Sequence, residues 1–320
     1  MKKNIIQKMV ISFAILCMLF MIKNNVFAYN NENNVMYEPQ KIPAEFDSNI
    51  SFQMIEEEIQ NYIEINNLNI QIGTEEYLDL MYSILYGEVD NITQNTERYF
   101  AAYASMYVVN VQENDTDNML NSESINESTS DLNCTISDMQ KKNQEFKNLL
   151  NTKNNEYKSK SAKASGRYNI SKAQEYAKTY AKTWNYVYGK YSSDCTNFAS
   201  QIVHNAGMPL VVGEWQWNGN SIAKRTWNVA HTFTEYWSIT RGYNGGGYTN
   251  RRDTNKNANP GDFIAYMNVD TYEIWHVAFV QSKSSDGAIY ITQHTTDRYN
   301  EKWNSIPINH TSDYIIIKFS

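Results

Sequence analysis

The sequence lacks the residue spacings that usually bind metal ions. It contains three cysteines and five histidines in 320 residues, with neither a CxxC nor an HExxH pattern. Structural zinc sites draw on closely spaced Cys and His pairs, so we expect no metal site and no cofactor. An excess of positive charge is also missing, since the formal net charge is −7. A basic patch is typical of nucleic-acid binding, so we expect no nucleic-acid partner.

A hydrophobic run long enough for a typical membrane span is missing as well. The N-terminal run from Met9 to Ile22 covers 14 mostly apolar residues, which suits the core of a signal peptide better than a span. Lysines precede it, and Val26-Phe27-Ala28 resembles a cleavage site. We therefore predict a signal peptide at residues 1–28 and no stable span after its removal. An uncleaved anchor is the alternative, and both predict an extracellular protein, free or associated with the cell wall.

Two cysteines, Cys134 and Cys195, follow the signal peptide. In an oxidising compartment they could form one disulfide. Cys134 lies in a polar stretch rich in Ser and Asn, whereas Cys195 lies at the start of a helical pattern. We therefore expect two separate cysteines rather than a disulfide.

The composition divides the rest of the chain into three parts. Residues 29–111 carry apolar side chains at spacings of three and four, which predicts a mainly helical domain. Residues 112–165 are rich in Asn, Ser, Lys and Glu, so we expect a polar linker or a solvated spacer. Residues 166–320 are dense in Trp, Tyr and Gly and are predicted to form the C-terminal domain.

The C-terminal domain is predicted to be α+β. A helical pattern covers residues 168–184, and a second begins at Cys195 and ends at Gly207. After a long insertion at residues 210–259, turn signals separate strand-like runs. These runs cover residues 262–266, 276–282, 288–292 and 314–319. Helices followed by antiparallel strands predict helices packed on an antiparallel sheet, behind the helical N-terminal region.

Cys195 is the candidate nucleophile. Its sequence context places the thiol in the first turn of a helix, with Asp194 as the predicted N-cap. The helix N-terminus carries a partial positive charge that favours the thiolate and lowers the thiol pKa. First-turn backbone N–H groups can also stabilise an oxyanion. A buried cysteine with only a packing role is the alternative.

His276 is the candidate base. It opens a predicted strand, from which its ring can project over the sheet edge toward a helix N-terminus. The next strand would pair antiparallel with it and bring Gln293 and His294 close to the ring. Either side chain could hold the reactive tautomer, the third role in a Cys–His–polar triad. Strand alternation puts the two on opposite faces and a bulge would exchange them, so both stay open.

Residues 166–320 resemble the putative amidase domain family. The most specific part is the block Asp-Cys-Thr-Asn-Phe at residues 194–198. Further matching segments are Gly261-Asp262, Trp275-His276 and Gln293-His294-Thr295-Thr296-Asp297-Arg298. This family is similar to the NlpC/P60 and CHAP enzymes of the papain-like superfamily.

The resemblance implies a papain-like fold and the cleavage of amide bonds, often in peptidoglycan. It implies that Cys195 is the nucleophile and His276 the base. It favours His294 as the third catalytic residue, while similarity to CHAP enzymes would favour Gln293.

Other polar and aromatic residues allow two interpretations. Asp194 could touch substrate rather than cap the helix, and Asn197 could bond the active-site loop or lie on the helix surface. The aromatic insertion could line a glycan or peptide cleft, or fill the core. Its tryptophans are Trp215, Trp217, Trp227 and Trp237.

The sequence therefore predicts an exported cysteine hydrolase that cuts amide bonds through a thioester. Its expected partner is peptidoglycan or a peptide substrate. A non-catalytic surface binding module on the same fold is the alternative. Transfer of the thioester to an amine, as in a transpeptidase, also stays open.

Overall fold

The structure is a computed structural model that describes residues 36–118, 132–157 and 168–320. The predicted signal peptide lies outside these residues. Within the described ranges, no helix is long and apolar enough to cross a membrane.

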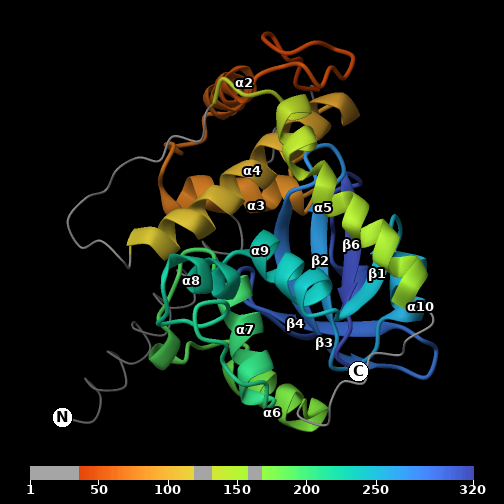
Figure 1. The fold of residues 1–320 in the computed structure, drawn as a ribbon. Helices are drawn as coiled ribbons and strands as arrows, with labels where there is room; N and C mark the ends of the chain where they lie inside the picture. Colours follow the sequence, from red (N-terminus) through yellow and green to blue (C-terminus); the bar gives the residue numbers. More distant parts are fainter. Residues whose placement is uncertain (1–35, 119–131, 158–167) are drawn as a thin grey trace, which may run out of the picture.

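Within the described residues, four helices precede the C-terminal domain, and Figure 1 labels them. They are α2 (Phe52–Ile65), α3 (Glu75–Leu85), α4 (Gln94–Asn118) and α5 (Ile136–Tyr157). Ser51 and Thr74 cap α2 and α3 by accepting hydrogen bonds from backbone N–H groups. The predicted boundary between residues 111 and 112 needs correction, because α4 runs through it. The polar side chain of Gln112, read as the start of a linker, is instead buried.

Five α-helices follow residue 168. They are α6 (Ile170–Tyr180), α7 (Cys195–Asn205), α8 (Ser221–Asn228), α9 (Ala230–Glu235) and α10 (Arg251–Asn257). Short helical turns cover Tyr186–Tyr188 (η1), Tyr236–Thr240 (η2) and Trp303–Ser305 (η3). The helix predicted from Cys195 is confirmed, and Gly207 follows it with a φ of 109°. This left-handed conformation favours glycine and ends the helix.

The strands form one antiparallel sheet in the order β1-β6-β2-β3-β4-β5. They are β1 (Asn244–Tyr248), β2 (Phe263–Asn268), β3 (Ile274–Lys283), β4 (Ile289–Gln293), β5 (Arg298–Lys302) and β6 (Ser312–Ile317). The predicted strand runs correspond to β2, β3, β4 and β6. Strands β1 and β5 were not predicted. The α+β class with a helical N-terminal region is confirmed.

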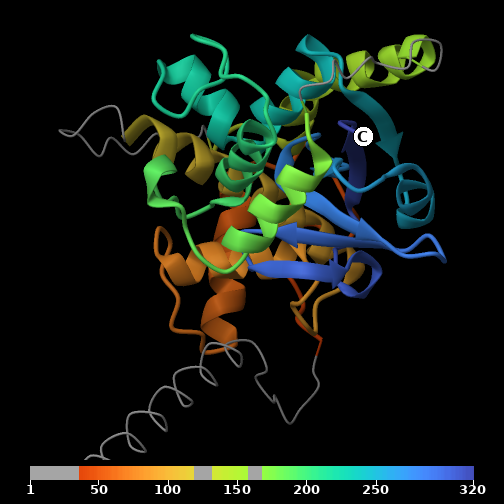
Figure 2. The same ribbon diagram turned by 90° about the horizontal axis from the view of Figure 1, so that it is seen from below.

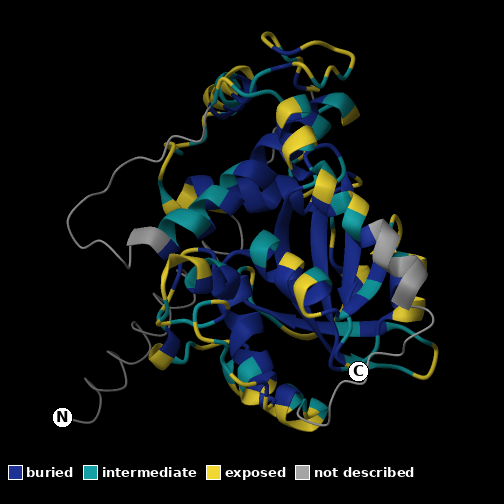
Figure 3. Cartoon of the chain, in the orientation of Figure 1, coloured by how far each residue is buried: buried dark blue, intermediate teal, exposed yellow. Residues whose placement is uncertain are grey.

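Both faces of the sheet are buried, as the dark strands in Figure 3 show. One face, with Ala278 and Val280, shares a core with the helices α2–α4. The other face, with Val277 and Phe279, packs with residues of α6–α9 and the end of the chain. Figure 2 shows the blue strands between the orange N-terminal helices and the green and teal helices. The N-terminal helices are therefore one layer of the fold.

The tryptophans of the insertion pack mainly in the core. Trp215, Trp227 and Trp237 are almost fully buried, and Trp217 packs against the same cluster from a partly buried position. Trp215 and Trp227 contact each other, with ring centroids 4.7 Å apart. The structure thus favours core packing over a glycan-binding cleft for this insertion.

Candidate active site

Cys195 is the first residue of α7, as the sequence predicts, and its thiol is buried. The Sγ atom lies 3.5 Å from the hydroxyl of Thr196 and 3.8 Å from Nε2 of Gln112. The backbone N–H of Val277, the residue after His276, faces the thiol and acts to lower its pKa. The helix start and strand β3 therefore meet at this sulfur.

Burial raises the pKa of the Cys195 thiol above its ordinary value. Removal from water penalises the thiolate more than the hydroxyl of Thr196 and the N–H of Val277 stabilise it. The expected lowering by the helix N-terminus is thus outweighed in this state of the protein. The thiol is neutral at pH 7.

Asp194 occupies the N-cap position, but its side chain does not cap α7. Its carboxylate instead accepts hydrogen bonds from Asn197 Nδ2 at 2.8 Å and from the ring of His294, where Oδ2 lies 2.6 Å from Nδ1. The N-cap prediction for the Asp194 side chain is therefore corrected. The first-turn N–H groups of α7 are left without a side-chain cap.

Asn197 belongs to the same scaffold. Its Oδ1 accepts a hydrogen bond of 2.8 Å from Nε1 of the buried Trp227. The Asn197 side chain is thus used by Asp194 and Trp227, and it is not a free surface group. These bonds hold the start of α7 in place.

His294, just after β4, is bound to this scaffold rather than to His276. Its Nε2 lies 2.7 Å from the carbonyl oxygen of Tyr180, and its ring stacks on Phe198 with centroids 3.9 Å apart. Burial lowers the pKa of His294, but the carboxylate of Asp194 outweighs it, so the pKa is raised overall. With both ring nitrogens engaged, His294 anchors α7 to the end of β4.

His276 lies on β3 and is fully buried. Its ring is surrounded by aromatic rings, with the centroid of Tyr266 at 5.1 Å and that of Tyr86 at 6.1 Å. Among the described residues, neither ring nitrogen has a hydrogen-bond partner, so no hydrogen bond joins the ring to Cys195. Burial lowers the pKa of His276 to about 3. The imidazole is therefore neutral, with its base nitrogen unoccupied.

Gln293 lies on the same face of the sheet as His276. Thr292 pairs with Phe279, so Gln293 comes opposite Ala278, whose side chain shares the face of His276. The Gln293 side chain opposes the lowering of the pKa of His276, although no hydrogen bond of good geometry forms. This places Gln293, rather than His294, beside the candidate base.

The amide of Gln293 has a defined orientation. Its Nε2 lies 3.2 Å from the carbonyl oxygen of Thr295 and 2.9 Å from the hydroxyl of Tyr86. A carbonyl oxygen can only accept, so the atom facing Thr295 is the NH₂ group. The acceptor Oε1 is therefore the atom left without a partner in the described structure. That oxygen is available to accept an N–H from His276.

Three residues of the N-terminal region reach the site although no sequence motif marks them. Gln112 contacts Cys195, as above, and Tyr86 contacts Gln293. The hydroxyl of Tyr82 lies 2.5 Å from Oγ of Ser193, two residues before the nucleophile. In sequence the two tyrosines look like ordinary helix positions and Gln112 like the start of a linker. Their partners lie 81 to 207 residues away along the chain.

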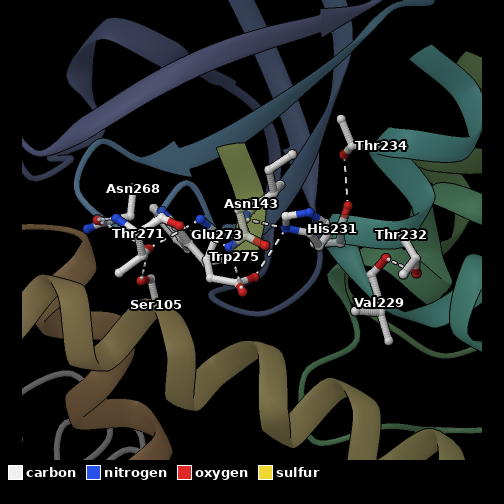
Figure 4. Close-up of polar contacts among 12 residues, drawn as sticks. Ser105, Asn143, Val229, His231, Thr232, Thr234, Asn268, Thr271, Glu273 and Trp275 are labelled. Atoms are coloured by element: carbon white, nitrogen blue, oxygen red, sulfur yellow. Dashed lines mark hydrogen bonds and ion pairs between the residues drawn. The ribbon is translucent and has the colours of Figure 1, made fainter. Parts of the chain in front are cut away.

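A second buried polar cluster lies beside the start of β3 (Figure 4). His231 Nδ1 lies 3.1 Å from Oε2 of Glu273, and Oε1 of the same carboxylate accepts a hydrogen bond of 3.0 Å from Asn143. The N–H of Ile274 reaches the same ring nitrogen at 3.3 Å. The cluster borders a cavity of about 380 Å³ between α4, α5 and α9. It joins α5 and α9 to the strand that carries His276.

Burial also acts on this pair. It lowers the pKa of His231, but the carboxylate of Glu273 outweighs it and raises the pKa overall. Burial acts to raise the pKa of Glu273, and its bonds to His231 and Asn143 outweigh that and lower it. Within the described residues, no group of three or more His, Cys, Asp or Glu side chains forms a metal-binding cluster. Neither Cys134 nor Cys195 forms a disulfide with another described residue.

Comparison with known proteins finds a family model that matches just under half of the chain. Residues 167–317 match the putative amidase domain. This match supports a hydrolase of amide bonds. Cys195, His276, Gln293 and His294 all lie within the matched amidase domain, whereas Tyr82, Tyr86 and Gln112 lie outside it.

One curated relative is the uncharacterized protein YhbB of Bacillus subtilis (strain 168). It is 27% identical over 136 residues, which cover 41% of this chain and 43% of that protein. The chain therefore matches less than half of the relative's length. No solved structure matches the chain.

Proposed function

We propose that the protein is an exported, cysteine-dependent amide hydrolase that acts on peptide or amide bonds of peptidoglycan. Cys195 is the nucleophile, His276 the general base and Gln293 the residue that orients the base. The observation that carries the proposal is the meeting of the buried thiol at the start of α7 with strand β3 at Val277, directly after His276. This histidine has two unengaged ring nitrogens and a free amide oxygen beside it.

The Gln293 oxygen decides which ring nitrogen acts as the base. In the proposed reactive arrangement it accepts the N–H of one nitrogen, so that the other nitrogen holds a lone pair. A polar side chain that fixes the tautomer is the third element of a Cys–His–polar triad. We assign this role to Gln293, and the role of anchoring α7 to His294.

The reaction follows from the neutral state of both groups. Sγ attacks the amide carbon, its proton moves to the lone pair of His276, and the C=O π electrons form an oxyanion. Collapse breaks the C–N bond, and the amine leaves with the proton held by His276. Water, deprotonated by the same ring, then releases the acid from the thioester and restores the thiol.

The described state is closed to substrate. Cys195 is 1% exposed and His276 is 0% exposed, so a substrate reaches the thiol only after neighbouring side chains move. Closure excludes water from the site, which protects a thioester from unselective reactions.

Export and the substrate class rest on the sequence. The segment at residues 1–28 has the charge pattern and apolar length of a signal peptide. The resemblance to NlpC/P60 and CHAP enzymes supports a papain-like fold and peptidoglycan as substrate. An exported amide hydrolase of this type would meet the peptides of the cell wall.

The test compares the mature chain with its Cys195→Ala and Cys134→Ala variants on purified peptidoglycan. New amino groups are assayed and the products are identified by mass. The proposal predicts release by the wild type and by Cys134→Ala, which removes the other cysteine of the mature chain, and none by Cys195→Ala. Release that survives in Cys195→Ala would contradict cysteine catalysis. Absence of release from the wild type would contradict peptidoglycan as substrate.

A further inference from the structure

Gln112 reaches the nucleophile from outside the matched amidase domain. It lies on α4, and its side chain is 1% exposed. Its Nε2 lies 3.8 Å from Sγ of Cys195, 3.0 Å from Oγ of Ser193 and 3.1 Å from the carbonyl oxygen of Trp275. The Gln112 amide nitrogen thus contacts the sulfur of Cys195, the hydroxyl of Ser193 and the backbone of strand β3 next to His276.

The orientation of this amide is fixed by its other end. Oε1 of Gln112 accepts a hydrogen bond of 2.8 Å from the backbone N–H of Ala230. An N–H can only donate, so the atom facing Ala230 is the oxygen and the atom facing Cys195 is the NH₂ group. The structure therefore directs N–H donors at the sulfur.

One of these N–H groups can turn to a new acceptor at little cost. Ser193 Oγ also bonds the hydroxyl of Tyr82, so it keeps a partner when Gln112 turns away. The second N–H of Gln112 stays on the carbonyl oxygen of Trp275. The donor is thus already in place before a substrate arrives, which is the condition for effective oxyanion stabilisation.

A second set of donors belongs to the first turn of α7, the helix that begins at Cys195. Asp194 does not cap α7 with its side chain, because that carboxylate is used by Asn197 and His294. The first-turn N–H groups of α7 therefore remain available beside Sγ and carry the positive end of the helix dipole. An oxyanion on a carbon bonded to Sγ would lie between these groups and Gln112.

We propose that Gln112 is a catalytic residue, supplied by the N-terminal helices, that donates a hydrogen bond to the oxyanion formed when Cys195 attacks a carbonyl. This inference rests on Cys195 being the nucleophile of the proposed function. It makes the amidase domain incomplete without α4. The N-terminal region is then part of the enzyme rather than a spacer.

The experiment compares two reactions of Cys195 in the whole mature chain. Acylation by p-nitrophenyl acetate passes through an oxyanion: the C–S bond forms, and p-nitrophenolate leaves with the electrons of the C–O bond. Alkylation by iodoacetamide displaces iodide at carbon and forms no oxyanion. Peptide mass mapping confirms that each label sits on Cys195.

The variants are Gln112→Met, which removes the donor, and Gln112→Glu, which keeps an acceptor for Ala230. Asn110→Ala is the control, because this amide lies on the same helix, contacts Met106 and lines the cavity beside α5. In both Gln112 variants we expect acylation to slow by about 10²–10³-fold. Alkylation should change by less than about tenfold, since it depends on the thiolate alone.

The outcomes separate this inference from the proposed function. Equal losses in both reactions, or acylation that is unchanged or faster in the Gln112 variants, would overturn the donor role. A wild type that is not acylated at Cys195 would overturn it as well. Normal acylation of the wild type without peptidoglycan cleavage would contradict only the proposed substrate.

Discussion

The two histidines nearest the nucleophile lie in opposite surroundings. His294 has both ring nitrogens engaged and a raised pKa, because it faces the carboxylate of Asp194. His276 has neither nitrogen engaged and a pKa lowered by burial to about 3. Buried polar groups without partners are rare in folded proteins and call for an explanation. This difference supports a structural role for His294 and the proposed catalytic role for His276.

The largest expected effect is on activity, in the His276 region. His276→Leu removes the base and should lower kcat by about 10²–10⁴-fold. It also removes two unsatisfied buried nitrogens, so the free energy of unfolding should fall little or rise. Steady-state kinetics and urea denaturation measure the two effects. A His276→Leu variant that fails to fold would contradict this difference between the two histidines, because the His276 ring would then be needed for stability.

The His294 region should respond in the opposite way. His294→Ala leaves the Asp194 carboxylate buried without its charged partner and should lower the free energy of unfolding by about 3 kcal/mol. The raised pKa of His294 means that its contribution is complete below the unfolded pKa and is lost as pH rises through the folded pKa.

The difference in unfolding free energy between wild type and His294→Ala should therefore be largest near pH 6 or below and shrink at alkaline pH, with about 6.5 as the unfolded pKa. Urea denaturation across this range measures it. A difference that grows with pH would contradict the assignment of the charged pair. Loss of turnover in a fully folded His294→Ala variant would instead support His294 as the third catalytic residue, the role that the family resemblance favours.

Gln293 lies directly before His294 in sequence and beside the ring of His276, so its variants test the proposed orientation of that ring. Gln293→Leu should lower kcat by up to about 10²-fold through loss of ring orientation. Gln293→Glu places a carboxylate beside the ring and should raise the pKa of His276, which moves the acid limb of the pH–kcat profile upward. A role confined to packing would leave that limb in place in both variants.

The smallest expected effect concerns the thiol in the free enzyme. Burial raises the pKa of Cys195, so alkylation by iodoacetamide should still accelerate as pH rises past about 8.5, the ordinary pKa of cysteine. Cys134→Ala provides a background with one remaining thiol. A plateau at neutral pH would reveal a preformed thiolate and contradict the neutral pair in the closed state.

Much of the fold could be predicted because its signals are local. The helix from Cys195 and the pairing of β3 with β4 follow from periodicity and from a Ser-Asp-Gly turn. Strand β1 was missed because Asn244–Tyr248 contains three glycines, which have low strand propensity. Strand β5 was missed because Arg298–Lys302 is polar and lies at the edge of the sheet.

The sequence supplies candidate site residues but not the partners that they have in the folded chain. Asp194 stands at the N-cap position, yet the competing bonds to His294 and Asn197 arise only in the folded chain. Gln112 opens a stretch whose composition is typical of a linker, although its amide is buried against residues more than 80 positions away. The raised pKa of Cys195 is caused mainly by burial in the folded chain. A sequence pattern that marks the start of a helix does not show how deeply the thiol is buried.

The proposed mechanism requires that Cys195 form a covalent thioester with the help of His276. Peptide mass spectrometry can test this step directly, in acid-quenched mixtures of the mature protein and purified peptidoglycan. We expect an adduct with the mass of a cell-wall peptide on the peptide that contains Cys195, and its loss in His276→Leu. Peptidoglycan cleavage without any adduct on Cys195, or an equal adduct in His276→Leu, would contradict the account.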